Sequence, residues 1–201
     1  MSGYRGKRLL DLTLAIPALI VSLPVQAVLA IAVHRKLGSP VIFRQQRPGR
    51  DGEPFELRKF RTMLDIDESK GLVSDDDRMT SFGAKLRATS MDELPTLWNV
   101  VRGDMSLVGP RPLLMRYLDR YTPDQARRHE VHPGLTGLAQ VNGRNGISWD
   151  EKFRLDIEYV DSLSLSGDVR IILQTLAKVV RREGISADGI STMTEFTGRE
   201  F

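Results

Sequence analysis

Asp92 and Glu93 form the pair of side chains in this sequence that is best suited to chemistry on a phosphate group. An ionised aspartate can attack phosphorus and hold the transferred group as a covalent intermediate, and nearby cations such as Arg87 favour the ionised form. A helix that starts here would also attract phosphate to its N-terminus. A structural interpretation stays open, because Ser90 and Glu93 have the spacing of a capping box and acidic residues complement the dipole at a helix start.

Two further segments supply groups that can bind phosphates. In residues 109–112, prolines on both sides constrain the backbone around Arg111, whose guanidinium can bind a phosphate through two hydrogen bonds. Residues 134–145 form a glycine-rich segment that includes Arg144 and suits a nucleotide diphosphate, although it matches neither the phosphate-loop nor the dinucleotide fingerprint. A carboxylate that attacks a diphosphate must overcome charge repulsion, so we expect a divalent cation. Oxygen ligands favour Mg²⁺.

Residues 12–33 carry no formal charge and are long enough to reach across a membrane. At about 1.5 Å per residue, a helix of this length matches the hydrocarbon core of a bilayer, which is about 30 Å thick. A cleaved signal peptide fits poorly, because the apolar run exceeds the usual length and lacks a clean small-residue cleavage site. The segment is therefore predicted to anchor the chain in a membrane.

The residues of this segment are consistent both with a helix that crosses the membrane and with one that returns to the same side. The positive-inside tendency places both flanks in the cytoplasm. The basic flanking residues are Arg5, Lys7 and Arg8 before the segment and Arg35, Lys36, Arg44, Arg47 and Arg50 after it. Pro17 and Pro24 each remove a backbone donor and favour a kink, and Ser22 stands close enough to Pro24 to bond a freed carbonyl.

The rest of the pattern predicts a mainly α fold with a small antiparallel β-hairpin. Residues 40–43 and 55–60 read as short strands on either side of a turn-rich segment at 47–52. The acidic stretch 65–78 is interpreted as a solvated loop. Helical patterns follow at 90–102, 113–121 and 123–131.

Two apolar stripes at helical spacing lie near the C-terminus. The first consists of Trp149, Phe153, Ile157 and Val160, and the second of Val169, Ile172, Leu173, Leu176, Val179 and Val180. We expect both stripes to face the core. The alternative for the second stripe, which has basic residues near its end, is a helix that lies among lipid headgroups beside the anchor.

Length and composition limit what the chain can do. Its 201 residues fit one domain with a substantial core, and 41% of them are hydrophobic and 27% charged. The formal net charge of +3 favours anionic partners such as nucleotides and lipid headgroups but is too small to indicate nucleic-acid binding. The absence of cysteine excludes disulfides and thiolate zinc sites. A membrane-anchored binding protein for anionic lipid explains the anchor and the charge, but not Arg111 beside an acidic pair.

Four motifs in one order identify a family resemblance. They are Lys59-Phe60-Arg61-Thr62-Met63, Asp92-Glu93-Leu94-Pro95, Gly109-Pro110-Arg111-Pro112 and Pro133-Gly134-Leu135-Thr136-Gly137. In this order, and over about residues 7–182, the chain resembles the bacterial sugar transferases, which are monotopic phosphoglycosyl transferases. Its short length is similar to the minimal form of that family, which begins bacterial protein N-glycosylation.

The resemblance implies an enzyme that moves a sugar phosphate from a UDP-sugar to undecaprenyl phosphate and releases UMP. Asp92 would be the nucleophile and a ligand of Mg²⁺, and Glu93 would be its essential partner and assist the attack by the acceptor phosphate. The residues predicted to bind substrate are Arg87, Arg111, Lys59, Arg61 and Arg144. Among N-acetylated amino sugars, N,N′-diacetylbacillosamine is the favoured sugar.

The resemblance also implies a location at the cytoplasmic face of the bacterial inner membrane and favours re-entry of the anchor helix. Downstream glycosyltransferases would be further partners. Members of the family usually bend this helix at an adjacent serine and proline, whereas here Leu23 separates Ser22 from Pro24. The predicted segments are a re-entrant anchor at 1–38, a catalytic core at 39–183 and a C-terminal tail at 184–201.

Overall fold

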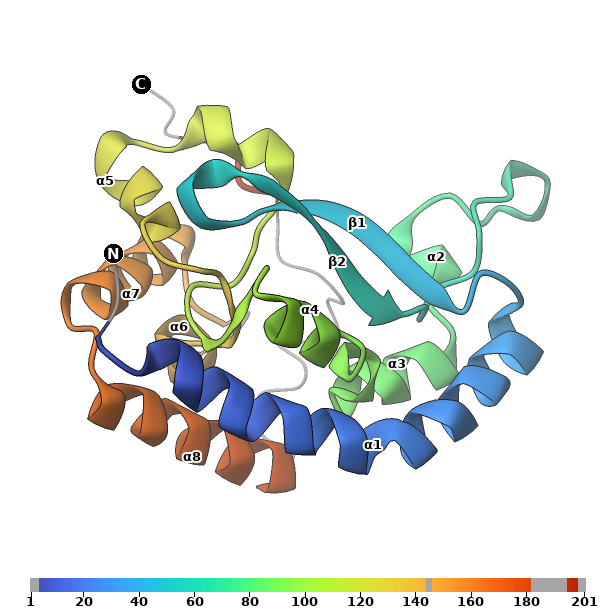
Figure 1. Ribbon diagram of the computed structural model, residues 1–201. Coiled ribbons are helices and arrows are strands. Elements are labelled where there is room, and N and C mark those ends of the chain that lie inside the picture. The colour runs from blue at the N-terminus through green and yellow to red at the C-terminus, as the bar shows by residue number, and fades with distance from the viewer. Residues whose placement is uncertain (1–3, 144–145, 182–194, 199–201) are drawn as a thin grey trace.

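The fold is known from a computed structural model, which describes residues 4–143, 146–181 and 195–198 (Figure 1). The α-helices are α1 Lys7–Leu37, α2 Asp75–Arg78, α3 Ser81–Ala88, α4 Thr96–Arg102, α5 Pro123–Ala126, α6 Leu138–Asn142, α7 Trp149–Asp161 and α8 Leu165–Arg181. The strands are β1 Ile42–Pro48, β2 Pro54–Phe60, β3 Ser106–Val108 and β4 Gly134–Thr136. Short 3₁₀ helices are η1 Arg50–Gly52, η2 Glu68–Lys70, η3 Met91–Glu93, η4 Met115–Arg120 and η5 Arg127–His129. The expected mainly α fold with a small antiparallel hairpin is confirmed.

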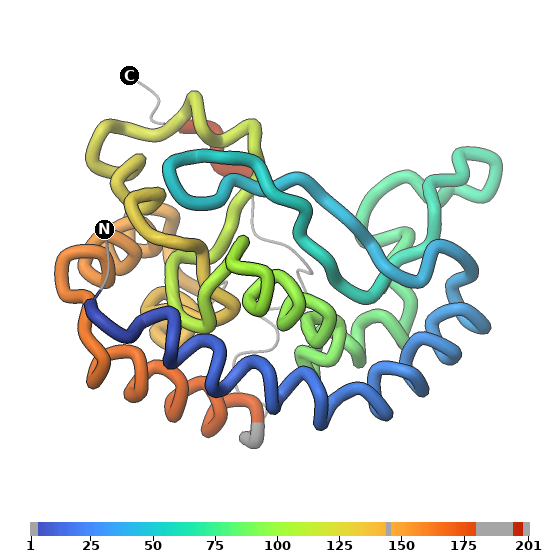
Figure 2. Tube along the Cα trace, in the orientation of Figure 1, coloured from blue at the N-terminus to red at the C-terminus, as the bar shows by residue number. Residues whose placement is uncertain are grey.

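Helix α1 is a continuous helix of 31 residues that contains Pro17 and Pro24 and follows a curved path along one side of the molecule (Figure 2). Only 6% of its most apolar stretch is buried, which sets it apart from the core helix of a soluble protein. Its large exposed apolar side chains are Leu9, Leu14, Ile16, Ile20, Val21, Leu23, Val25, Val28 and Ile31. The Ser22 hydroxyl donates to the carbonyl of Leu19 at 2.9 Å. This carbonyl is one residue before that of Ile20, which Pro24 leaves without its helical donor.

The first two turns of α1 are held by polar contacts to the core. Arg8 donates to the backbone carbonyl of Val100 at 2.6 Å. Asp11 is buried and accepts hydrogen bonds from the Ser106 hydroxyl and the Leu107 amide, each at 2.9 Å. Because all of these partners lie in or beside α4 and β3, this end of α1 is fixed to the domain that carries the acidic pair.

The last turns of α1 pack against the same domain through apolar contacts. Val33 and Leu37 are buried in a cluster with Phe60 of β2 and Leu86 of α3. Both ends of the anchor helix therefore contact the core, while its middle exposes apolar side chains to the surroundings.

The predicted hairpin forms between β1 and β2, which pair antiparallel from Ile42–Phe60 to Pro48–Pro54. At its tip, Asp51 and Gly52 take left-handed backbone conformations, with φ of 55° and 78°, as the turn-rich sequence indicates. Helix α4 is joined to β2 by side-chain bonds. Thr96 donates to the carbonyl of Arg58 at 2.8 Å, and the Asn99 amide donates to that of Glu56 at 2.8 Å. These bonds place the start of α4 beside the end of the hairpin.

A short parallel pair, β3 with β4, is not predicted by the sequence patterns. It brings together the two glycine-containing motifs at 109–112 and 133–137. Gly134 approaches Gly109 so closely that a Cβ at position 134 would lie 2.1 Å from the Gly109 nitrogen. Any larger residue would push these segments apart, so a glycine is needed here for close backbone packing.

The two apolar stripes near the C-terminus differ in their surroundings. On α7, Phe153 is buried and the other stripe residues are partly buried, so the expected core face is confirmed. On α8, Val169, Leu173, Leu176 and Val179 are exposed by 40–61%, and the expectation of a core face is wrong for them. The helix buries a different side, through Ile171, against β3 and its neighbours.

Most of the predicted tail, 184–201, lies outside the described residues. Within 195–198, Phe196 is buried and stacks edge-on against Tyr117 and Phe153, with ring centroids 5.6 and 5.0 Å away. This short segment therefore belongs to an aromatic cluster of the core, which the polar composition of the tail does not predict.

Candidate active site

Glu93 joins two basic side chains that are distant from it in sequence. The ammonium of Lys59 in β2 donates to Glu93 Oε1 at 2.6 Å, and the guanidinium of Arg111 donates to the same oxygen at 2.8 Å. Burial alone would raise the pKa of Glu93, but the charges of Lys59 and Arg111 outweigh it and hold that pKa well below its usual range. Glu93 is thus an ionised group that aligns two cations.

Asp92, by contrast, has no polar partner. Its residue is 7% exposed, and its carboxylate makes no hydrogen bond or ion pair with any residue in the described part of the chain. Burial and the neighbouring charge of Glu93 raise the pKa of Asp92 from 3.8 to about 6, against the opposing charges of Lys59, Arg111 and Arg87. The cations do favour the ionised form, as expected, but burial and the charge of Glu93 outweigh them and leave the pKa above its usual range.

The capping-box interpretation of Ser90 and Glu93 is also wrong. Ser90 has a left-handed backbone with φ of 56°, and its side chain makes no capping hydrogen bond. It lies between Thr89, the C-cap of α3, and the start of η3, and Glu93 contacts Lys59 and Arg111 rather than Ser90. A non-glycine residue in this conformation is strained, and such strain concentrates at functional sites.

The other predicted substrate-binding arginines have different locations. Arg87 donates to the Thr62 hydroxyl at 3.1 Å and lies near enough to Asp92 to oppose its rise in pKa. Arg61 is buried away from the acidic pair, where it donates to the carbonyls of Ser39 and Met63 and pairs with Asp65 at 2.7 Å. Its donors hold the backbone after the anchor, so its placement supports a structural role. Arg144 lies outside the described residues.

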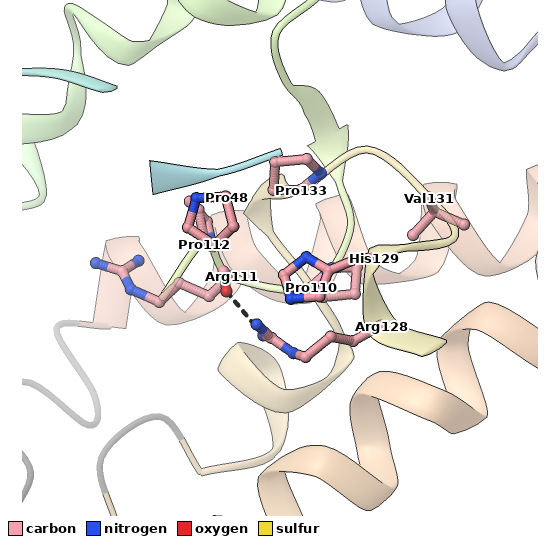
Figure 3. Close-up of a pocket in the computed structure, with 8 residues that line it drawn as sticks. All are labelled: Pro48, Pro110, Arg111, Pro112, Arg128, His129, Val131 and Pro133. Atoms are coloured by element: carbon pink, nitrogen blue, oxygen red, sulfur yellow. Dashed lines mark hydrogen bonds between the residues drawn. The ribbon is translucent and has the colours of Figure 1, made fainter. Parts of the chain in front are cut away.

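The backbone of Arg111 is held by Arg128, a member of a buried ion pair that sequence reasoning missed. Arg128 donates to the carbonyl of Arg111 at 2.8 Å and pairs with Asp156 at 2.7 Å, and both partners of this pair are at most 2% exposed. Figure 3 shows the carbonyl of Arg111 directed at Arg128 and its guanidinium directed the opposite way. The available signal was Asp156 itself, an acidic residue one position before Ile157 on the apolar side of α7.

A cleft of about 90 Å³ opens beside the Lys59–Glu93–Arg111 group. Its polar side chains come from the hairpin, η3, α4 and the 109–112 segment, and apolar side chains complete its lining. The lining residues are Arg47, Leu57, Lys59, Glu93, Thr96, Met105, Arg111, Pro112, Leu113, Gly134 and Leu135. The cleft has room for a group of phosphate size, but a whole sugar nucleotide would extend outside it.

Comparison with known proteins gives consistent matches. The sequence model of the bacterial sugar transferases matches residues 3–182. The sugar transferase EpsL of Bacillus subtilis is 55% identical over 194 residues, which cover 96% of each chain. The UDP-glucose:undecaprenyl-phosphate glucose-1-phosphate transferase of Caulobacter vibrioides is 41% identical, over 87% of this chain and 69% of its own length. The undecaprenyl-phosphate galactose phosphotransferase of Salmonella typhimurium is 38% identical, over 89% of this chain, which spans only 41% of that relative.

Proposed function

Because the chain belongs to the bacterial sugar transferase family, we propose that it moves a sugar phosphate from a UDP-sugar to undecaprenyl phosphate and releases UMP. The observation that carries this proposal is the Asp92 carboxylate, which is buried, near three cations and without a polar partner among the residues that the structure describes. The cations can stabilise the negative charge of a bound phosphate, and the unpartnered carboxylate is then free to react with it.

The proposed reaction has two steps. A carboxylate oxygen of Asp92 first attacks the β-phosphorus of the UDP-sugar, and the bond from that phosphorus to the bridging oxygen breaks, so UMP leaves with the electron pair. A phosphate oxygen of undecaprenyl phosphate then attacks the same phosphorus, and the bond to Asp92 breaks. Asp92 is regenerated, and the sugar is linked to the lipid through a diphosphate.

Glu93 acts through its neighbours in this scheme. A carboxyl group whose pKa lies far below neutrality is a poor proton acceptor, and among the described residues the side chain of Glu93 accepts hydrogen bonds from Lys59 and Arg111. We therefore assign Glu93 the task of orienting these two cations toward the phosphates of the substrate, rather than that of a general base for the acceptor.

The residues are compatible with the expected Mg²⁺. The described residues hold no cluster of three or more acidic or histidine side chains that could bind a metal by themselves. Mg²⁺, however, is commonly held by one or two carboxylates together with substrate phosphates, and no other described residue bonds the carboxylate oxygens of Asp92. When bound there, the ion would offset the repulsion between Asp92 and the diphosphate. Chelation of the metal should then suppress UMP release.

The anchor helix is proposed to enter and leave the cytoplasmic face of the inner membrane. Support comes from its two ends, which both contact one domain through Arg8 and Asp11 at the start and Val33 and Leu37 at the end. A helix that crossed the bilayer would separate its ends by the thickness of the membrane. The exposed apolar side chains of α8 would lie in the adjacent headgroup layer.

Cysteine labelling tests the topology, since the chain has no cysteine of its own. Single Arg5→Cys and Arg35→Cys variants would be exposed to a membrane-impermeant maleimide in spheroplasts and in inverted membrane vesicles. Both positions should react in inverted vesicles only. Reaction of one position in spheroplasts would establish a crossing helix.

The identity of the transferred sugar and the pathway that uses it are less narrowly defined than the reaction. The names of the relatives mention glucose and galactose, whereas the minimal form of the family favours N,N′-diacetylbacillosamine and protein N-glycosylation. Downstream glycosyltransferases would extend either product. UMP release measured across a panel of UDP-sugars identifies the sugar, and a preference for UDP-glucose or UDP-galactose would argue against the N-glycosylation pathway.

Trapping of the intermediate tests the mechanism. Protein incubated with UDP-sugar and Mg²⁺ but without acceptor should release UMP up to one equivalent and gain the mass of a phosphosugar on Asp92. Initial rates with both substrates should show ping-pong behaviour. An intersecting pattern with no adduct would indicate direct attack by the lipid phosphate, and binding of anionic lipid without UMP release would indicate a scaffold protein.

A further inference from the structure

Arg47, at the end of β1, is a cleft residue with little to compensate its charge. Its guanidinium donates to the Gln45 side chain at 2.6 Å and, at 3.4 Å, to the carbonyl of Pro112. Its Nε is buried and has no hydrogen-bond partner. No carboxylate in the described part of the chain forms an ion pair with it. Burial and the like charge of Arg111 lower the pKa of Arg47 to about 10.

The charged groups that line the cleft are unequal in number. Arg47, Lys59 and Arg111 face it, and among the described residues Glu93 is the only acidic one in its lining. Glu93 is already shared between Lys59 and Arg111. A partly buried guanidinium without a counter-ion, beside a second guanidinium, is unfavourable unless an anion binds to it.

We propose that Arg47 and Arg111 together bind a phosphate group in this cleft, between the hairpin and the 109–112 segment. Arginine recognises phosphate through its planar set of donors, the unpartnered Nε of Arg47 offers one such donor, and the volume of about 90 Å³ has room for several water-sized groups. The phosphate belongs to the nucleotide of the donor or to the head of the lipid acceptor. The choice of these two ligands rests on the proposed function, but the binding itself does not require the covalent step.

Binding measurements on the full chain in detergent test this inference. An Asp92→Asn background prevents turnover, and titration calorimetry measures the affinity for UMP and, separately, for a short-chain polyprenyl phosphate. Arg47→Gln should weaken binding of at least one of these ligands by about 10- to 100-fold, and Arg47→Lys should recover part of the loss. The ligand that loses affinity identifies the source of the phosphate.

Arg44→Gln is the matched control, because Arg44 lies on the same strand, is 60% exposed and contacts Glu56 only at 3.5 Å. It should leave both affinities unchanged. Equal affinities of Arg47→Gln and the parent for both ligands would overturn the inference, as would an equal loss in Arg44→Gln. Failure to trap an adduct on Asp92 while Arg47→Gln still loses affinity would remove the proposed mechanism and leave the phosphate site in place.

Discussion

The Arg128–Asp156 pair and the Asp92 site both contain buried acidic and basic side chains. In the first the charges are paired with each other, and in the second the charge of Asp92 is not paired with that of any described residue. Arg128 and Asp156 are almost completely buried, and Arg128 is bonded both to its partner and to the carbonyl of Arg111. Asp92 is also buried, but within the described part of the chain its carboxylate has no polar partner, and no carboxylate there forms an ion pair with the nearby Arg47. The first group supports the fold, whereas for the second we propose that a ligand supplies the missing compensation.

We use this difference to distinguish charged side chains that stabilise the fold from those proposed to act on a ligand. Removing one member of a compensated pair leaves a buried charge unpaired and destabilises the protein. Removing a buried charge that has no partner should stabilise the folded state, and it should also abolish any reaction that needs this charge. Four experiments compare these two effects.

Asp92→Asn should have the largest effect, and it should act in opposite directions on activity and stability. Loss of the nucleophile should reduce UMP release by about 10⁴-fold or more. The pKa of Asp92 is raised from 3.8 to about 6 in the folded state, so its contribution to stability is present below pH 4 and is lost as the pH rises through 6. The neutral variant should therefore be more stable at pH 7.5, by about 1–3 kcal/mol, in chemical denaturation. A variant that unfolds at lower denaturant concentration than the parent would show that the charge of Asp92 is stabilised in the folded protein.

Asp156→Asn should lower stability where Asp92→Asn raises it. The variant leaves Arg128 buried without a full counter-charge, which should cost about 3–5 kcal/mol in the free energy of unfolding. Because Arg128 holds the backbone of Arg111, the folded fraction should also show a higher KM for UDP-sugar with a smaller change in kcat. The double variant Arg128→Met with Asp156→Leu should recover stability but not KM. Unchanged KM in both variants would show that the pair does not position Arg111.

The pH dependence of adduct formation should report the ionisation of Asp92. With a pKa of about 6, its ionised fraction falls roughly tenfold between pH 7 and pH 5, and the rate of adduct formation should fall with it. Higher Mg²⁺ concentration should move the inflection to lower pH, since a bound cation favours the carboxylate. A rate that is flat from pH 7 to pH 5 at low Mg²⁺ would show that Asp92 is already ionised in the free protein.

Arg154→Ala should have the smallest effect. Arg154 on α7 pairs with Glu151 and Glu158 at 2.7 and 2.9 Å, but all three side chains are more than 40% exposed. Water screens such pairs and replaces their interactions. The melting temperature and the rate of UMP release should match those of the parent protein, and a clear loss of either would show that exposure does not separate this pair from Arg128–Asp156.

Local patterns in the sequence were enough to predict the hairpin, the apolar anchor helix and the buried stripe on α7, and to single out the acidic pair. Each depends on residues that are neighbours along the chain, such as the turn chemistry at 47–52 and the uncharged run at 12–33. The same kind of local pattern misled for Ser90, whose spacing to Glu93 fits a capping box but whose backbone is left-handed. It also misled for α8, where an apolar stripe does not say whether protein or lipid covers it.

The amino-acid sequence by itself determined which residues are chemically able to act, the membrane-binding character of the first helix and, through the order of the four motifs, the family. Tertiary structure alone decided the partners. It joined Lys59, Glu93 and Arg111, left Asp92 without one, committed Arg61 to the backbone, and placed Arg128 and Asp156 behind the site. The physical reason is that compensation of a charge depends on burial and on distances between side chains far apart in the chain, and neither is contained in the spacing of residues along it.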